Sequence, residues 1–268
     1  EIGVRLVGSE MCIRDSHQDH PLDNGSTMRI YRNGNHQYWT DDDPIKRPSV
    51  TSLIAYVDGG AFGAGKGWAV REIRKDYLEQ GAGGRPNFDI PDILTNKARD
   101  EGNKLHSDID KYIKTSGGYI AEENPAFLAW HRAMANHLYL DSEVFTYHPA
   151  LNYGGTIDQI ALIGDDIVIQ DVKSVDPESW AKHGSKYRWA KDQTQTTAYI
   201  LALRQSGSRY KAVKGEIVYV LRDGSGVFTE EVHITTGMAL FSNSRQIYDT
   251  LKLENKERSN NLKEEIGK

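Results

Sequence analysis

Cysteine is almost missing from this chain. Cys12 is the single cysteine in 268 residues, which excludes an internal disulfide and a zinc or iron–sulfur site built on several cysteines. Long apolar runs are missing too, because no 18 consecutive residues are apolar, and no membrane-spanning helix is predicted. The N-terminus lacks the basic region, apolar stretch and cleavage site of a secretory signal. We therefore expect a cytoplasmic protein without a membrane partner.

The chain also lacks the positive net charge that is typical of nucleic-acid-binding proteins. Lys and Arg number 33 against 38 Asp and Glu, which gives a net charge of -5. Phosphate contacts depend on local charge, however, and residues 182–214 are strongly basic, with Asp192 as their one acidic residue. We expect Lys186, Arg188 and Lys191 of this segment to bind substrate. A solvated helix face is the alternative interpretation.

The composition, with 38% hydrophobic and 26% charged residues, is that of a soluble globular protein. Residues 6–16 match the translation of a transposase sequencing adapter, so we expect residues 1–27 to be an adapter artefact or a disordered tail. We predict one domain over residues 28–256, divided into an N-terminal hairpin and helical part (28–142) and a catalytic core (143–256). A charged tail should follow over residues 257–268.

The order of predicted elements indicates the fold class. A hairpin is expected around Asn33-Gly34-Asn35, followed by helices over 68–78 and 93–114 and a third that starts at Pro125. Strands are predicted over 144–147, 155–163, 167–172, 213–221 and 227–232, with helices over 189–204 and 236–253. This order predicts an α/β (α+β) fold, in which helices flank a mixed central sheet after an N-terminal helical region.

One predicted hairpin carries the chemistry. Asp158 lies in its first strand and Asp171 in its second, and adjacent strands bring such side chains within about 5 Å of each other. Two carboxylates at that distance can share one hard cation such as Mg²⁺. Lys173 lies two residues after Asp171 and therefore points to the same face of the strand, where it can orient or acidify an attacking water. Paired carboxylates, a metal ion and a lysine are what phosphodiester hydrolysis requires.

Four short motifs resemble those of a known family, and they follow one another along the chain in the order that the family has. Gly155-Thr156-Ile157-Asp158 with Asp171-Val172-Lys173 resembles the core of the RecB-family branch of PD-(D/E)XK nucleases. Gln195 and Tyr199 match its Gln-x-x-x-Tyr motif, and Gly102 to His106 match its Gly-x-x-x-His motif. Pro48-Ser49-Val50-Thr51 is similar to the N-terminal segment of phage and mitochondrial genome-maintenance exonucleases. The resemblance covers roughly residues 29–205.

The resemblance implies a restriction-endonuclease-like fold and specific roles for the matched residues. The catalytic residues would be Asp158, Asp171 and Lys173. The ligands of Mg²⁺ or Mn²⁺ would be His106, Asp158, Asp171 and the Val172 carbonyl. Gln195 and Tyr199 would act on the substrate or on the geometry of the site. Glu143 could add a further acidic group, but we favour a solvated glutamate at the start of a strand.

The activity implied by the resemblance is a metal-dependent DNA exonuclease in phage or bacterial DNA recombination, repair or degradation. Its partners would be DNA, single-stranded or with a free end, and a phage or host recombination protein. A structure-specific endonuclease and a catalytically silent DNA-binding subunit are the alternatives. Gly60 to Lys66 also fits the start of a phosphate-binding loop, but Gly67 replaces the required Ser or Thr. We therefore favour a hinge or substrate-entry loop there.

Overall fold

A computed structural model describes residues 16–55, 57, 64–80, 85–134, 136–186, 188–212 and 214–266. The elements of the N-terminal half are β1 (Ser16–Pro21), β2 (Thr27–Arg32), β3 (Tyr38–Thr40), α1 (Val50–Leu53), α2 (Ala64–Glu79), α3 (Ile90–Lys114) and α4 (Pro125–Ala133). Those of the C-terminal half are β4 (Leu138–His148), β5 (Tyr153–Ile163), β6 (Asp166–Val175), α5 (Pro177–His183), α6 (Trp189–Gln205), β7 (Lys214–Leu221), β8 (Val227–Glu231) and α7 (Ile234–Ile266).

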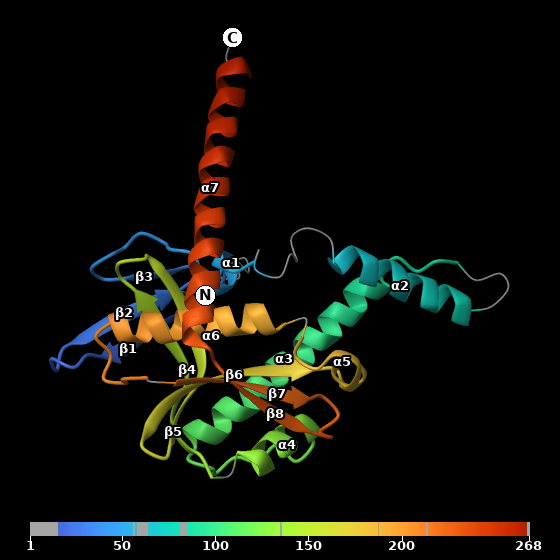
Figure 1. Cartoon of the computed structure of the whole chain (residues 1–268), viewed down its shortest axis with the longest axis horizontal. Helices are drawn as coiled ribbons and strands as arrows, with labels where there is room; N and C mark the ends of the chain where they lie inside the picture. Colours follow the sequence, from blue (N-terminus) through green and yellow to red (C-terminus); the bar gives the residue numbers. More distant parts are fainter. Residues whose placement is uncertain are drawn as a thin grey trace, which may run out of the picture.

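A five-stranded mixed sheet forms the centre of the molecule, in the order β4-β5-β6-β7-β8 (Figure 1). Neighbouring strands are antiparallel except β6 and β7, which are parallel. A parallel pair needs a crossover connection, and α5 and α6 supply it. The predicted α+β fold class, a mixed sheet flanked by helices, is confirmed.

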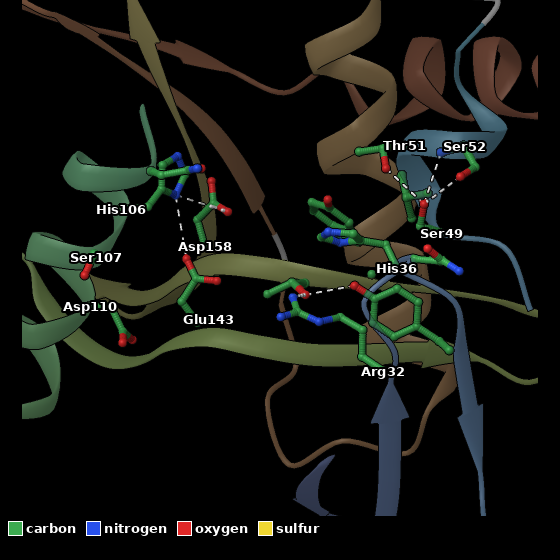
Figure 2. A pocket seen from close by; sticks show the side chains of 17 residues that line it. Arg32, His36, Ser49, Thr51, Ser52, His106, Ser107, Asp110, Glu143 and Asp158 are labelled. Carbon is green, nitrogen blue, oxygen red and sulfur yellow. Dashed lines mark hydrogen bonds and ion pairs between the residues drawn. The ribbon is translucent and has the colours of Figure 1, made fainter. Parts of the chain in front are cut away.

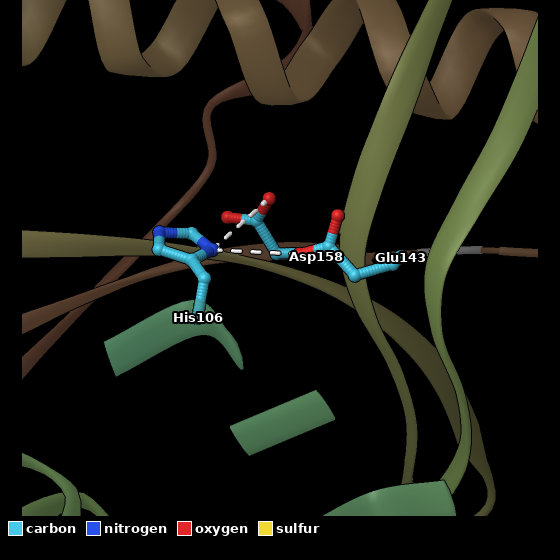
Figure 3. A group of neighbouring side chains, drawn as sticks. All are labelled: His106, Glu143 and Asp158. Carbon is cyan, nitrogen blue, oxygen red and sulfur yellow. Dashed lines mark ion pairs between the residues drawn. The ribbon is translucent and has the colours of Figure 1, made fainter. Parts of the chain in front are cut away.

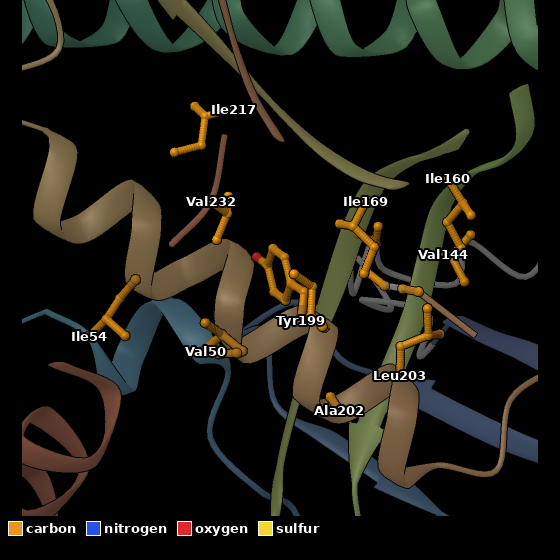
Figure 4. Close-up of a cluster of buried hydrophobic side chains, with 14 of the residues drawn as sticks. Val50, Ile54, Val144, Ile160, Ile169, Tyr199, Ala202, Leu203, Ile217 and Val232 are labelled. Carbon is orange, nitrogen blue, oxygen red and sulfur yellow. The ribbon is translucent and has the colours of Figure 1, made fainter. Parts of the chain in front are cut away.

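Helices cover both faces of this sheet, because successive side chains of β7 pack alternately into two different hydrophobic cores. Ile217 and Tyr219 belong to one hydrophobic core with residues of α1, α6 and α7 (Figure 4). Val218 and Val220 belong to a second core with residues of α3 and α4. A strand buried on both faces is apolar at consecutive positions, as the sequence Ile-Val-Tyr-Val-Leu of β7 is.

A small antiparallel sheet, β1-β2-β3, packs on β4 through Ile30 and Tyr38, which contact the Phe145 and Tyr147 cluster. Of the two alternatives expected for residues 1–27, an adapter artefact or a disordered tail, the disordered tail is wrong for residues 16–27. Residues 16–21 are strand β1, paired along their length with β2. β1 has little apolar pattern of its own, and its structure comes from backbone pairing with β2. Residues 1–15 lie outside the described residues.

Two other predictions need correction. The predicted loop 174–187 contains α5, whose first turn is capped by Asp176, since its Oδ2 accepts from the Ser179 N–H at 2.8 Å. The helix predicted to end near residue 253 continues to Ile266, through most of the expected charged tail, and projects from the body (Figure 1). Most of the glycine-rich segment that resembles a phosphate-binding loop lies outside the described residues. Among the residues that are described, no helix is long and apolar enough to cross a membrane.

Candidate metal centre

A cavity of about 730 Å³ opens between α1, α3, β4, β5 and the β2–β3 turn. His106, Glu143 and Asp158 lie together at one end of it (Figure 2). The hydroxyls of Ser49, Thr51 and Ser52 lie at the other end, with Ser49 Oγ 2.9 Å from each of the other two. Carboxylates are therefore concentrated at one end of the cavity, and hydrogen-bond donors at the other.

Three potential metal ligands converge at the carboxylate end (Figure 3). His106 Nδ1 lies 3.6 Å from Glu143 Oε1 and 3.7 Å from Asp158 Oδ1. One ligand atom from each residue lies within 4.8 Å of the other two. Burial alone would lower the pKa of His106, but the carboxylates of Asp158 and Glu143 raise it to about 9. The two carboxylates therefore favour positive charge at this position, which a divalent cation bound to the deprotonated imidazole would also supply.

Strand register brings Glu143 to this group. β4 and β5 pair Ser142 with Gln159 and Val144 with Ile157, which sets Glu143 opposite Asp158. Glu143 has a φ of 50°, in the left-handed region that residues with a side chain seldom adopt and that is often found at functional sites. The expectation of a solvated glutamate at a strand start is wrong, because Glu143 lies well inside β4 and faces two other polar side chains.

The second carboxylate that the sequence predicts to be catalytic, Asp171, lies in an adjacent polar network. Asp171 is fully buried, and its Oδ2 is 2.5 Å from Lys173 Nζ. Gln195 Nε2 donates to Asp171 Oδ1 at 3.2 Å and to Tyr199 Oη at 2.9 Å. Burial raises the pKa of Asp171 to about 7. Burial lowers the pKa of Lys173, but the carboxylates of Asp171, Asp192 and Asp158 together raise it above its usual value, which favours the protonated amine. Gln195, which is itself bonded to Tyr199, contacts both members of the Asp171–Lys173 pair from α6.

Asp158 connects the two groups. Pairing of β5 with β6 ends at Gln159 and Gln170, so the strands separate where Asp158 and Asp171 would pair. Asp158 Oδ2 accepts instead from the Val172 N–H at 2.8 Å. Since the N–H and C=O of a strand residue point to the same side, the Val172 carbonyl also lies on the Asp158 side. Of the four predicted ligands, His106 and Asp158 belong to the three-residue group. Asp171 does not, because Lys173 and Gln195 engage its carboxylate.

Two glycines of β5 allow the surrounding side chains to approach. A Cβ on Gly155 would lie 2.4 Å from Tyr199 Cε1, and one on Gly154 would lie 2.3 Å from Tyr38 Cγ. Atoms cannot approach so closely, so larger residues at these positions would displace both tyrosines. The glycines thus allow Tyr199 of α6 and Tyr38 of β3 to line the cavity.

The predicted substrate-binding cations are not at the cavity. Within the described part of the chain, Lys186, Arg188 and Lys191 are absent from its lining. Arg188 Nε pairs with Asp192 Oδ2 at 3.2 Å. The basic segment passes through α5, a turn, α6 and the start of β7, so side chains that are close in sequence point in different directions. The cavity wall instead carries Arg32, whose Nη1 donates to Thr156 Oγ1 at 3.2 Å.

The helix that delivers His106 is fixed by a buried polar network two residues further along. Asp108 is 2% exposed. Its carboxylate accepts from Asn124 Nδ2 at 2.7 Å, Tyr119 Oη at 2.8 Å and Lys104 Nζ at 3.1 Å. Burial alone would raise the pKa of Asp108, but these three donors lower it below its usual value. The ionised carboxylate therefore stabilises the native state.

We expect Asp108→Ala to lower the free energy of unfolding by about 3 kcal/mol, because it leaves the buried Asn124 amide and two partly exposed donors without their acceptor. Urea denaturation measures this, with Asp100→Ala, at an exposed position of the same helix, as the control. Because the folded pKa is depressed, the contribution is complete above the unfolded pKa of about 4 and is lost as pH falls through the folded value. The difference between wild type and Asp108→Ala should therefore shrink in acid. A constant difference would contradict this account.

Comparison with known proteins adds little to this geometry. No family model matches the chain, and no curated protein matches it. The crystal structure of SSO0001 matches 74% of this chain and 75% of its own, with 14% sequence identity and a TM-score of 0.34. A likeness that weak bears on neither the fold nor the function.

Proposed function

We propose that this protein is a divalent-metal-dependent nuclease that hydrolyses DNA phosphodiester bonds, of the PD-(D/E)XK type and the RecB-family branch. One observation carries the proposal. Residues of motifs that are far apart in sequence line a single cavity: Ser49 and Thr51, His106, Asp158 and Tyr199. Since nothing in local structure requires the four segments to meet, their convergence supports a shared chemical role.

The donor set fits a divalent cation. An imidazole nitrogen and two carboxylates suit Mn²⁺, and Mg²⁺ with additional water. His106, Glu143 and Asp158 would hold the ion, which when bound stabilises charge at the phosphorus and lowers the pKa of water. Lys173 would hold a proton close to the attacking water, and Asp171 and Gln195 keep its ammonium in position.

The rest of the cavity suits a phosphodiester backbone. Arg32 and the hydroxyls of Ser49, Thr51 and Ser52 offer donors to phosphate oxygens. The β2–β3 turn and α1 line the end of the cavity opposite the metal ligands, and a strand that threads between these elements to reach the ion would enter by its end. We therefore propose an exonuclease. An intact Asp158, Asp171 and Lys173 set argues against a silent DNA-binding subunit, which has no need of one.

Closed and linear forms of one single strand test this proposal. With Mg²⁺ or Mn²⁺, the linear strand should be degraded and the covalently closed circle should persist. EDTA should stop the degradation of the linear strand. The rate should fall steeply with salt, because phosphate contacts release counterions. Equal digestion of both forms would indicate the endonuclease, and binding without digestion of either would indicate the silent subunit.

We expect Glu143→Gln to weaken Mn²⁺ binding at least tenfold, since losing even an outer-shell partner typically costs 10-fold to about 100-fold. The half-exposed side chain lies outside the hydrophobic cores, so the fold should persist. Titration of free Mn²⁺ measures the affinity, and Glu122→Gln, exposed after α3, is the control. Unchanged affinity in Glu143→Gln would remove Glu143 from the metal centre.

A further inference from the structure

One side chain of β1 reaches the backbone of the metal centre. Gln18 lies on the face of β1 that packs on β4, and its register partner in β2 is the buried Ile30. Its Oε1 accepts from the Phe145 N–H at 2.7 Å, and its Nε2 donates to the Glu143 carbonyl at 2.6 Å. Both bonds span more than 120 residues of sequence.

The two hydrogen bonds of Gln18 take the place of those that a further strand beside β4 would make. Among the strands of the described residues, β4 is at the edge of the five-stranded sheet, so its outer N–H and C=O groups have no sheet partner there. The Gln18 amide supplies one donor and one acceptor at the separation that a neighbouring strand would offer. Glutamine and asparagine are the side chains that provide both in one neutral group, and glutamine has the longer reach.

Glu143, whose carbonyl accepts from Gln18, has a strained backbone conformation. Glu143 has a φ of 50° within a strand. Rotation of its backbone toward ordinary strand geometry would move its carboxylate away from His106 and Asp158. The Gln18 amide holds the peptide groups on both sides of Val144 and so opposes that rotation.

We propose that Gln18 is a positioning residue for the metal centre, which fixes the Glu143 backbone so that its carboxylate meets His106 and Asp158. This inference rests on the metal centre proposed above. It makes β1 part of the functional site, although Gln18 lies more than 120 residues from Glu143 in sequence.

The test is Mn²⁺ affinity of the full chain, read from the electron paramagnetic resonance signal of free Mn²⁺. We expect Gln18→Met, which keeps the length of the side chain and removes both bonds, to bind at least tenfold more weakly. Gln246→Met, at an exposed position of α7, is the matched control. Asp19→Ala removes an ion pair between β1 and β2 on the opposite face and tests whether loosening β1 is sufficient. Thermal melting checks the fold of each variant.

Gln18→Glu is the second variant, for the case that Gln18→Met does not fold. It retains the acceptor for the Phe145 N–H and removes the donor to the Glu143 carbonyl. Its added negative charge alone would strengthen Mn²⁺ binding, so weaker binding points to the lost donor.

Equal or tighter binding in the folded Gln18 variants overturns the positioning role and leaves the metal centre standing. Equal weakening in Asp19→Ala also overturns it, because β1 would then act only through stability. Absence of Mn²⁺ binding in the wild type overturns the metal centre itself, and with it this inference.

Discussion

Asp158→Asn will slow DNA cleavage in Mg²⁺ by a factor of about 10² or more, as is typical for loss of a group that stabilises a transition state. Asp158 belongs to both polar groups, because Oδ1 faces His106 and Oδ2 accepts from the Val172 N–H. Asparagine can keep the second contact with its oxygen, but it then turns an NH₂ group toward the cation. The fold should therefore persist while the metal affinity falls.

Asp165→Asn is the matched control for this variant. It makes the same substitution at an exposed position in the turn between β5 and β6, the hairpin that carries Asp158. Rates are measured on an end-labelled single strand, and melting temperatures confirm folding. If folded Asp158→Asn cut within a few-fold of the wild type, the site would be assigned to the wrong residues.

Lys173→Met should lower the cleavage rate by about 10²–10⁴, the range typical of a group that moves or holds a proton, while Mn²⁺ still binds. We expect the cleavage rate to fall without a loss of Mn²⁺ affinity because Lys173 contacts Asp171 and Gln195 rather than His106, Glu143 and Asp158. The variant also leaves Asp171 buried without its cation, so we expect a loss of about 3 kcal/mol in stability unless Asp171 takes up a proton.

Lys182→Met controls for this change, since its ammonium is exposed in α5 and pairs with Glu178 at 3.8 Å. Single-turnover rates and Mn²⁺ affinities are measured on both variants below their melting temperatures. Parallel loss of metal affinity and cleavage in Lys173→Met would assign the lysine to the structure of the site rather than to its chemistry.

Most of the central fold could be predicted from the sequence because its signals are local. The apolar run of β7, the Asn124-Pro125 start of α4 and the turn at Gly164 each specify their element without reference to distant residues. The same holds for Asp171 and Lys173, whose separation of two residues places them on one face of β6. α5 was missed although Asp176, Pro177 and Gly184 carry ordinary capping signals.

The part that could not be predicted depends on contacts between distant segments. Glu143 joins the centre through the β4–β5 register and a left-handed backbone, and neither leaves a sequence signature. Gln18 contacts residues more than 120 positions away. Arg32 reaches the cavity from β2, whereas the basic segment 182–214, which is predicted to bind substrate, is distributed over several elements.

We propose that one divalent cation bound in this cavity drives phosphodiester hydrolysis. Anomalous scattering from Mn²⁺ in crystals of the full chain locates that ion directly. The predicted result is a peak within bonding distance of His106, Glu143 and Asp158, at an Mn²⁺ concentration that supports DNA cleavage. A cleaving protein with no ion at these three side chains, or with its ion elsewhere, would contradict the account.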